Sequence, residues 1–328
     1  MDKWHGKPYY SLDAYCKNTY RRKLYKIALN AQMTCPNRDG LLDTRGCLFC
    51  SAGGSGEFAS DILPGDLSFS EDNSNGIRKQ LAEGISRFGN KNTGDGFIAY
   101  FQAYTNTYGP IPYLNLLYHA ALDTENVHGI SIATRPDCLG APVLGLLTEL
   151  KRDYPDRFIW IELGLQTIHE QTAKYIRRGY PLKVFEKAFR ELSDIGIPVI
   201  VHVILGLPGE DLPMQLETIK YLSRLQPFGV KLQLLHVLKG TDLEKEYLSG
   251  KVYIPTKEEY LDTLILCIEN LHPDIVIHRV TGDGRGSDLI APDWSRNKKD
   301  VLNSLHHLLK LRGARQGDRL KIPERNTP

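Results

Sequence analysis

The chain has 328 residues, of which 41% are hydrophobic and 24% charged, and this ordinary globular composition suits one large domain or two small ones. No apolar run approaches the roughly 20 residues of a membrane-spanning helix, and the N-terminal MDKWHGKPYY lacks the apolar core of a signal peptide. We therefore expect a cytoplasmic protein without a membrane partner. In such a protein the six cysteines favour metal binding or catalysis over disulfides.

The net charge of +2 is unevenly distributed. Residues 1–34 carry seven Lys/Arg and two Asp/Glu, and residues 294–328 carry nine Lys/Arg and three Asp/Glu, which leaves a net −9 between them. Two basic ends on an acidic body favour a polyanion lying against the ends. Solvated termini account for the same charges, because basic tails are common.

Short apolar segments alternate with amphipathic ones along most of the chain. After a polar, tyrosine-rich segment at residues 1–24, the pattern predicts strands at 26–31, 97–103, 129–134, 158–165, 198–205 and 230–237, with a seventh candidate at 275–280. It predicts helices at 71–89, 111–122, 142–152, 214–225, 257–271 and 297–312, and a helical pair broken near Gly179 and Pro181. This alternation indicates a parallel sheet covered by helices, either doubly wound or closed as a complete or partial barrel. No GxGxxG follows the first strand, which argues against a dinucleotide-binding sheet.

The first predicted strand leads directly into TCPNRDGLLDTRGCLFCSAGGSGE, residues 34–57. Cys47 and Cys50 form a CxxC turn that places two sulfurs on one side of a loop, and Cys35 has to fold back to join them. No fourth cysteine is nearby in the sequence. A structural zinc site is closed by a fourth Cys or His, whereas an iron–sulfur cluster can leave one iron open for a ligand. The spacing of the cysteines alone does not distinguish a zinc site from an iron–sulfur cluster.

Polar side chains recur where the predicted strands end, and in parallel barrels the loops at these ends build the active site. The candidate positions are Gln102, Tyr104, Thr105, Asn106, Thr134, Arg135, Glu162, Gln166, His202, Gly206 and Gly209. Glu162 lies inside the apolar FIWIELGL, and a buried carboxylate has to be paired or functional. His202, on another apolar strand, is also explained as a core histidine with its hydrogen bonds satisfied.

These segments together resemble the radical S-adenosylmethionine (SAM) superfamily, and more narrowly a bacterial subgroup related to the catalytic subunit of Elongator and to oxygen-independent coproporphyrinogen oxidase. The resemblance covers about residues 20–290 and rests on TCPNRDG with GCLFC, YFQAYTNTY, IATRPDCL, WIELGLQTIHEQT, IRRGY, HVILGLPGE, HVLKGTDL and HRVTGDG. Most members place three residues between the first two cysteines. Eleven residues lie between Cys35 and Cys47 here, as in the Elongator-like branch.

The resemblance implies an α/β fold with a partial TIM-like barrel of (β/α)6 type and parallel strands. Residues 1–24 would form a cap, 25–255 the barrel core, and 256–328 a C-terminal extension of helix, strand, TGDG loop, helix and basic tail. It also implies that Cys35, Cys47 and Cys50 bind a 4Fe–4S cluster, whose open iron binds SAM. Reductive cleavage of SAM would give a 5′-deoxyadenosyl radical that abstracts hydrogen from substrate, with an electron from a reductant such as flavodoxin or ferredoxin.

The same resemblance assigns roles around SAM. Phe49 would pack on the adenine, and Gly206 and Gly209 would allow close backbone approach to it. Glu162 and Gln166 would bind the ribose and methionine end, and Arg135 would pair with the carboxylate. Residues 102–107 take the place of a glycine-rich turn but contain no glycine.

The subgroup's implied substrate is tRNA, in which the wobble-uridine side chain is converted from carboxymethylaminomethyl to aminomethyl before a separate methyltransferase acts. Phosphate contacts dominate affinity for RNA, and the candidate contacts are Arg21, Arg22, Lys23, Lys298, Lys299 and Arg312. Two alternatives remain. One is a radical SAM enzyme acting on a small metabolite or tetrapyrrole, and the other is a zinc-bearing RNA-binding module without enzymatic activity.

Overall fold

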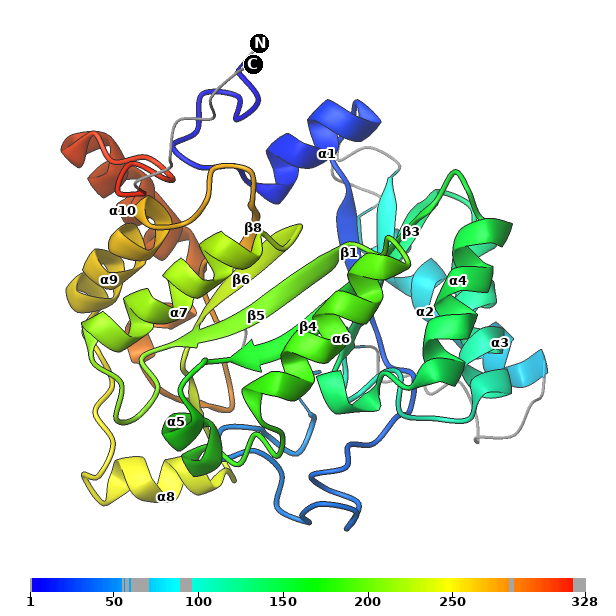
Figure 1. Ribbon diagram of the computed structural model, residues 1–328, viewed down its shortest axis with the longest axis horizontal. Coiled ribbons are helices and arrows are strands. Elements are labelled where there is room, and N and C mark those ends of the chain that lie inside the picture. Colours follow the sequence, from blue (N-terminus) through cyan, green and yellow to red (C-terminus); the bar gives the residue numbers. More distant parts are fainter. Residues whose placement is uncertain are drawn as a thin grey trace.

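The computed structural model describes residues 2–54, 56, 59, 71–88, 96–282 and 286–320. Within these ranges the main feature is a seven-stranded sheet in the order β1-β2-β3-β4-β5-β6-β8, with every neighbouring pair parallel. The strands are β1 Tyr25–Leu29, β2 Phe97–Phe101, β3 Val127–Thr134, β4 Phe158–Gln166, β5 Val199–Leu205, β6 Gly229–Leu234 and β8 Val276–Arg279. The sheet curls into a partial barrel, which confirms the predicted fold class and adds the seventh strand (Figure 1).

Helices connect the strands and cover the convex side of the sheet (Figure 1). Their bounds are α1 Leu12–Tyr20, α2 Glu71–Ser86, α3 Ile111–Leu122, α4 Ala141–Asp153, α5 Glu170–Tyr175, α6 Leu182–Asp194, α7 Leu212–Leu225, α8 Asp242–Leu248, α9 Lys257–Glu269 and α10 Lys298–Arg312. Two short 3-10 helices, Pro136–Cys138 and Asp293–Arg296, and a small antiparallel pair, β7 Val237–Leu238 with β9 Leu289–Ala291, complete the described elements. A search of the described helices for one long and apolar enough to cross a membrane finds none.

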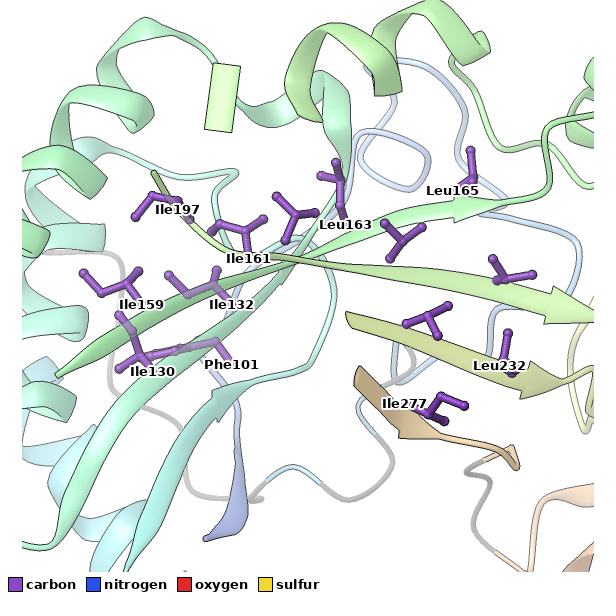
Figure 2. Packing of buried hydrophobic residues seen from close by; sticks show 14 of the residues in the cluster. Phe101, Ile130, Ile132, Ile159, Ile161, Leu163, Leu165, Ile197, Leu232 and Ile277 are labelled. Carbon is purple, nitrogen blue, oxygen red and sulfur yellow. The ribbon is translucent and has the colours of Figure 1, made fainter. Parts of the chain in front are cut away.

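The hydrophobic core lies between the sheet and its helices. Strand side chains point alternately to the two faces of a sheet, and on the helix-facing side they are almost all aliphatic. Figure 2 shows part of this layer, including Phe101, Ile130, Ile132, Ile159, Ile161, Leu163, Leu165, Ile197, Leu232 and Ile277. Burying this apolar surface supplies the main driving force for folding, so the opposite face of the strands can carry polar groups.

The inner face of the barrel changes character along the strand direction. Near the amino ends of the strands, an apolar plug is formed by Cys16, Leu24, Ile98, Trp160 and Ile200. The Trp160 ring stacks on Phe158 with centroids 3.9 Å apart. One step further along, the inward-facing residues are Lys26, Tyr100, Ser131, Glu162, His202 and Lys231, which we call the charged layer. The plug therefore closes one end of the barrel and leaves polar groups toward the other.

The sheet crosses the domain boundary expected at residue 256, because β8 pairs with β6. The N-terminal segment also joins the barrel, since Ser11 forms a parallel bridge with Ile277. The expected cap and C-terminal extension thus pack on the barrel core and contribute to its sheet. Residues 283–285 of the predicted TGDG loop and the basic tail at 321–328 lie outside the described residues.

Candidate active site

The three cysteines of the loop after β1 line one pocket at the carboxyl ends of the strands. Two turns shape this loop: the Cys35 carbonyl accepts from the Arg38 amide at 2.7 Å, and the Cys47 carbonyl accepts from the Cys50 amide at 3.0 Å. The Arg38 guanidinium donates to the Cys50 carbonyl at 2.7 Å and so ties the first turn to the second. This local folding brings Cys35 back to the CxxC pair, as the sequence predicts.

A segment between α5 and α6 anchors the cysteine loop to the barrel. The Asn37 side-chain amide donates to the Arg177 carbonyl at 2.7 Å and to the Cys47 sulfur at 3.4 Å. The Leu48 amide donates to the Ile176 carbonyl at 3.0 Å, and Arg177 Nε donates to the Gly46 carbonyl at 2.9 Å. The position of the loop therefore depends on residues about 130 positions away in the chain.

Nine of the predicted cofactor-binding residues line the same pocket as the cysteines: Phe49, Gln102, Tyr104, Thr105, Thr134, Arg135, Glu162, Gln166 and His202. Tyr104 and Gln166 have left-handed backbone conformations, with φ of +61° and +64°. Such strain in residues other than glycine gathers at functional sites. The buried Gln166 Oε1 has no hydrogen-bond partner in the described structure, so this strained residue holds a polar atom available to a ligand.

Three predicted cofactor-binding residues are not among those that line the pocket. Asn106 is buried and its side-chain amide donates to the Phe101 and Ala133 carbonyls at 3.1 and 3.0 Å, so it fixes the ends of two strands. Gly206 and Gly209 line a second cavity beside Pro255. Their positive φ angles of +80° and +83° explain the glycines as turn residues, without contact to the cysteine pocket.

Arg135 lines the pocket but is already paired. Its guanidinium donates to both carboxylate oxygens of Asp137, at 3.0 and 2.7 Å, and to the Arg178 carbonyl at 3.0 Å. Burial acts to lower the pKa of Arg135, but the hydrogen bonds to Asp137 outweigh it and raise that pKa. Arg135 and Arg178 both lie 4.9 Å from the Tyr180 ring centre. The structure thus places this arginine in a fixed stack, where a carboxylate ligand would compete with Asp137.

Glu162 is the centre of the charged layer and its side chain is fully buried. One carboxylate oxygen accepts from Lys26 Nζ at 2.5 Å and Ser131 Oγ at 2.6 Å. The other accepts from His202 Nε2 at 2.7 Å and from Lys231 Nζ. Both carboxylate oxygens thus have internal partners, and the contact of Glu162 with the ribose or methionine end of SAM stays a prediction.

The ion pairs decide the protonation of this layer. Burial acts to raise the pKa of Glu162, but Lys231 and then Lys26 outweigh it and hold that pKa well below its usual range. Burial and Lys231 lower the pKa of His202 to about 4, although Glu162 acts in the opposite direction. Neutral His202 then donates from Nε2 to Glu162, and its Nδ1 accepts from the Gln233 amide at 3.4 Å.

Several groups at the site escaped the sequence analysis. Lys26, Lys231 and Ser131 were not singled out, although each lysine interrupts an apolar strand just as Glu162 does. Asn37 and Tyr180 carried no recognisable signal, because their contacts come from loops distant in sequence. The two lysines could therefore have been singled out as charged residues in apolar strands, but the sequence does not show that both pair with Glu162.

The predicted RNA contacts fall into three places. Arg21, Arg22 and Lys23 directly precede β1, so they lie at the amino ends of the strands, opposite the cysteine loop (Figure 1). Lys298 and Lys299 begin α10, three and four residues after Ser295, whose hydroxyl is 3.1 Å from Nε2 of the pocket residue His236. Arg312 is paired with Asp262 at 2.5 Å. The six basic residues thus do not form one surface.

Comparison with known proteins decides the family. A model described as the Radical SAM superfamily matches residues 44–222, and one described as the Radical_SAM C-terminal domain matches residues 227–310. The chain belongs to the radical SAM superfamily. The uncharacterized protein YtqA of Bacillus subtilis is 38% identical to it, over 95% of this chain and 92% of its own length.

Two more distant similarities cover less of the other protein. The tRNA uridine(34) acetyltransferase of Methanocaldococcus jannaschii is 29% identical over 44% of this chain and 26% of its own length. The solved structure of Methanocaldococcus infernus Elp3, with an N-terminal deletion, matches with a TM-score of 0.64 and 17% identity. That match covers 89% of this chain but only 64% of the Elp3 chain. The protein described here is therefore shorter than the Elp3 chain, and the two share a fold.

The cofactors of a radical SAM enzyme are a 4Fe–4S cluster and SAM, and the pocket suits them. It combines three cysteines that form no disulfide with the unpartnered Gln166 Oε1. Among the residues described, no three His, Cys, Asp or Glu side chains are arranged around a single metal ion. In a four-iron cluster each cysteine binds a different iron, so its ligands need not converge as zinc ligands do. Burial and the neighbouring Cys50 raise the pKa of the Cys47 thiol to about 12, and metal coordination would deprotonate it.

The lowered pKa of His202 predicts a pH dependence of stability. The usual histidine pKa is about 6.5, and in the folded protein it is about 4. Between these values the unfolded chain binds a proton that the folded protein does not, so stability is complete above pH 6.5 and falls toward pH 4. Replacing His202→Gln should reduce the slope of unfolding free energy against pH in this window by up to about 1.4 kcal/mol per pH unit. Urea unfolding at stepped pH measures it, and an unchanged slope would contradict the assigned neutral state.

Proposed function

We propose that this radical SAM enzyme modifies the side chain of the wobble uridine in tRNA, converting carboxymethylaminomethyl to aminomethyl. The observation that carries the proposal is the similarity to a tRNA uridine(34) acetyltransferase over 147 residues. That similarity covers 26% of the acetyltransferase, so the proposal takes over the tRNA substrate and not acetyl transfer. The fold shared with an Elp3 chain is compatible with it.

The residues of the pocket have different proposed roles according to their position. We propose Cys35, Cys47 and Cys50 as the cluster ligands, with Asn37 and Arg38 holding their two turns together. When bound, the cluster and SAM supply a radical that removes a hydrogen atom from substrate. Phe49, Gln102, Tyr104, Thr105 and Gln166 line the space between the cysteine loop and the charged layer. These side chains would position SAM and exclude water from it.

The charged layer lies on the far side of this space from the cysteines, toward the closed end of the barrel. A substrate group inserted from the open end would meet SAM before it reached Glu162 and His202. A C–H bond beside the side-chain nitrogen of the modified uridine would then lie between the cofactor and the charged layer. Hydrogen abstraction at that carbon would leave a carbon radical that the adjacent nitrogen stabilises. Transfer of its unpaired electron to a one-electron acceptor would give an iminium ion, and addition of water would then break the C–N bond, releasing the carboxymethyl group as glyoxylate and leaving the amine.

The assignment of the cysteines is testable by single substitution. Cys35→Ala, Cys47→Ala and Cys50→Ala should each prevent assembly of an intact cluster, because the remaining two thiolates leave two irons without protein ligands. Iron content after anaerobic reconstitution, and 5′-deoxyadenosine released from SAM under dithionite, measure the effect. Cys267→Ala, on the buried face of α9, is the matched control and should keep both. Zinc without iron in the wild-type protein would instead support the RNA-binding module.

The substrate is tested by product analysis. The reconstituted protein, given SAM, reductant and tRNA that carries carboxymethylaminomethyluridine, should yield aminomethyluridine in nuclease digests analysed by mass spectrometry. Intact tRNA should also accelerate 5′-deoxyadenosine release more than the free nucleoside does, because phosphate contacts supply much of the affinity. Acceleration by a metabolite, with no change in the tRNA, would favour the small-molecule alternative.

The position of the basic residues predicts which of them bind the tRNA. The double substitution Lys298→Ala/Lys299→Ala should lower the slope of log affinity against log salt by about 1 to 2, since each phosphate contact contributes roughly 0.7 to 0.9. Arg21→Ala/Arg22→Ala, at the opposite end of the barrel, is the matched pair and should leave the slope unchanged. Filter binding at several salt concentrations distinguishes the two. The reverse result would show that tRNA reaches the amino ends of the strands.

A further inference from the structure

We propose that the side-chain amide of Asn37 donates a hydrogen bond to the cluster ligand Cys47 and so sets how easily the cluster accepts an electron. This inference rests on the proposed assignment of Cys35, Cys47 and Cys50 as ligands and goes beyond it, because it gives a residue that binds no iron a role in electron transfer. Asn37 is not among the residues that line the pocket. It is therefore a positioning residue that acts through Cys47.

The contacts of Asn37 determine which way its amide group points. Its Nδ2 atom lies 2.7 Å from the Arg177 carbonyl oxygen. A carbonyl oxygen can only accept, so the amide atom that faces it is the nitrogen and not the oxygen. The same nitrogen lies 3.4 Å from both the Cys47 sulfur and the Arg178 carbonyl oxygen. The amide has two N–H groups, so one serves the Arg177 carbonyl and the other is directed toward the sulfur.

Binding of iron changes which groups the Cys47 sulfur can bond. As a thiol it donates to the Arg177 carbonyl, with the two atoms 3.5 Å apart. Cysteine binds metal as a thiolate, which has no proton to donate, so sulfur and oxygen would then repel each other. Asn37 contacts both atoms and can donate to both. Its hydrogen bond to the thiolate would also be charge-assisted, and such bonds are roughly twice as strong as neutral ones.

The amide is held in place away from water. Asn37 is 2% exposed, and hydrogen bonds in such a low-dielectric interior are stronger than in solvent. The backbone of Gly179 packs directly against it. A Cβ atom at Gly179 would lie 2.6 Å from Asn37 Oδ1, and the φ angle of +86° is one that glycine adopts readily. The close packing keeps the amide oriented toward the sulfur before any cluster binds.

A donor to a ligand sulfur affects the reduction potential in a known direction. Reduction adds negative charge to the cluster, so a hydrogen bond to its sulfur stabilises the reduced form more and raises the potential. Arg38 and Arg135 line the pocket and act in the same direction through their positive charge. They have partners of their own in the Cys50 carbonyl and the Asp137 carboxylate. Both would stay in place in a variant that lacks the Asn37 amide, so the contribution of the amide can be measured separately.

The test is a redox titration of the full chain after anaerobic reconstitution, followed by electron paramagnetic resonance (EPR). Asn37→Leu keeps the approximate size of the side chain and removes both donors. At a fixed potential the ratio of reduced to oxidised cluster should fall about tenfold, which is about 59 mV for a one-electron couple. Arg177→Lys is the matched control, because it removes the Nε bond to the Gly46 carbonyl from the same loop but keeps the charge. It should retain the wild-type potential.

Iron content, measured on the same samples, separates this inference from the assignment of the ligands. A wild-type potential in Asn37→Leu with full iron content overturns the inference and leaves the cysteine ligands in place. An equal shift in Arg177→Lys also overturns it, because the position of the loop would then set the potential. A wild-type protein that binds no iron overturns the proposed ligands as well.

A measurement on the wild-type protein decides the question should Asn37→Leu hold no cluster. Asparagine side-chain amides are labelled with nitrogen-15, and the reduced cluster is studied by pulsed EPR. Asn37 is the asparagine that the structure places against a cysteine sulfur, whereas the Asn106 amide is bonded to strand carbonyls. A coupling between the cluster and a labelled amide nitrogen is expected. Its absence overturns the inference.

Discussion

The interaction on which this structure most depends is the buried ion network of Glu162. It joins strands that are far apart in the sheet order: Lys26 is on β1, Glu162 on β4 and Lys231 on β6. Hydrogen bonds join each strand to its neighbours, and their register is linked to the curl of the sheet. The two ion pairs add contacts across the inner face of the barrel between strands that are not neighbours. Removing Glu162 would leave two buried ammonium groups facing each other, which is far more costly than losing one hydrogen bond.

Such a network is a poor source of stability by itself, because desolvation of the charges offsets much of their attraction. In this barrel the network lies between two apolar regions. The plug around Trp160 lies inside the barrel, and the hydrophobic layer of Figure 2 lies outside the sheet. A set of aliphatic side chains would fill the same volume more cheaply. The presence of lysines and a carboxylate here therefore suggests a functional reason, and the open pocket above them supplies one.

The sequence was informative wherever a residue contradicted its local pattern. Alternating apolar strands and helices predicted the strands to within a few residues, and the charge within FIWIELGL marked Glu162 as paired or functional. Its partners were not predictable, because Lys26 and Lys231 lie on distant strands and reach Glu162 only when the sheet curls. Asn106, Gly206 and Gly209 sit at strand ends like true pocket residues, and only the direction of their side chains or turns separates them. The charge distribution was equally ambiguous. It predicted Arg21 and Lys298 as contacts for the same RNA, although they lie at opposite ends of the strands.

The direction of the strands explains why Arg21 and Lys298 are separated, and it also explains where the cysteine loop lies. In a parallel barrel each strand begins at one end and finishes at the other, so residues directly before β1 lie at the end opposite the loops that follow the strands. The cysteine loop follows β1 and is anchored by the segment between α5 and α6, through Asn37, Arg177 and Leu48. The cysteine loop is thus attached to the side of the barrel formed by β4 and β5, the strands that carry Glu162 and His202. The hydrogen bonds of Asn37, Arg177 and Leu48 therefore hold the cysteine loop on the same side of the barrel as Glu162 and His202.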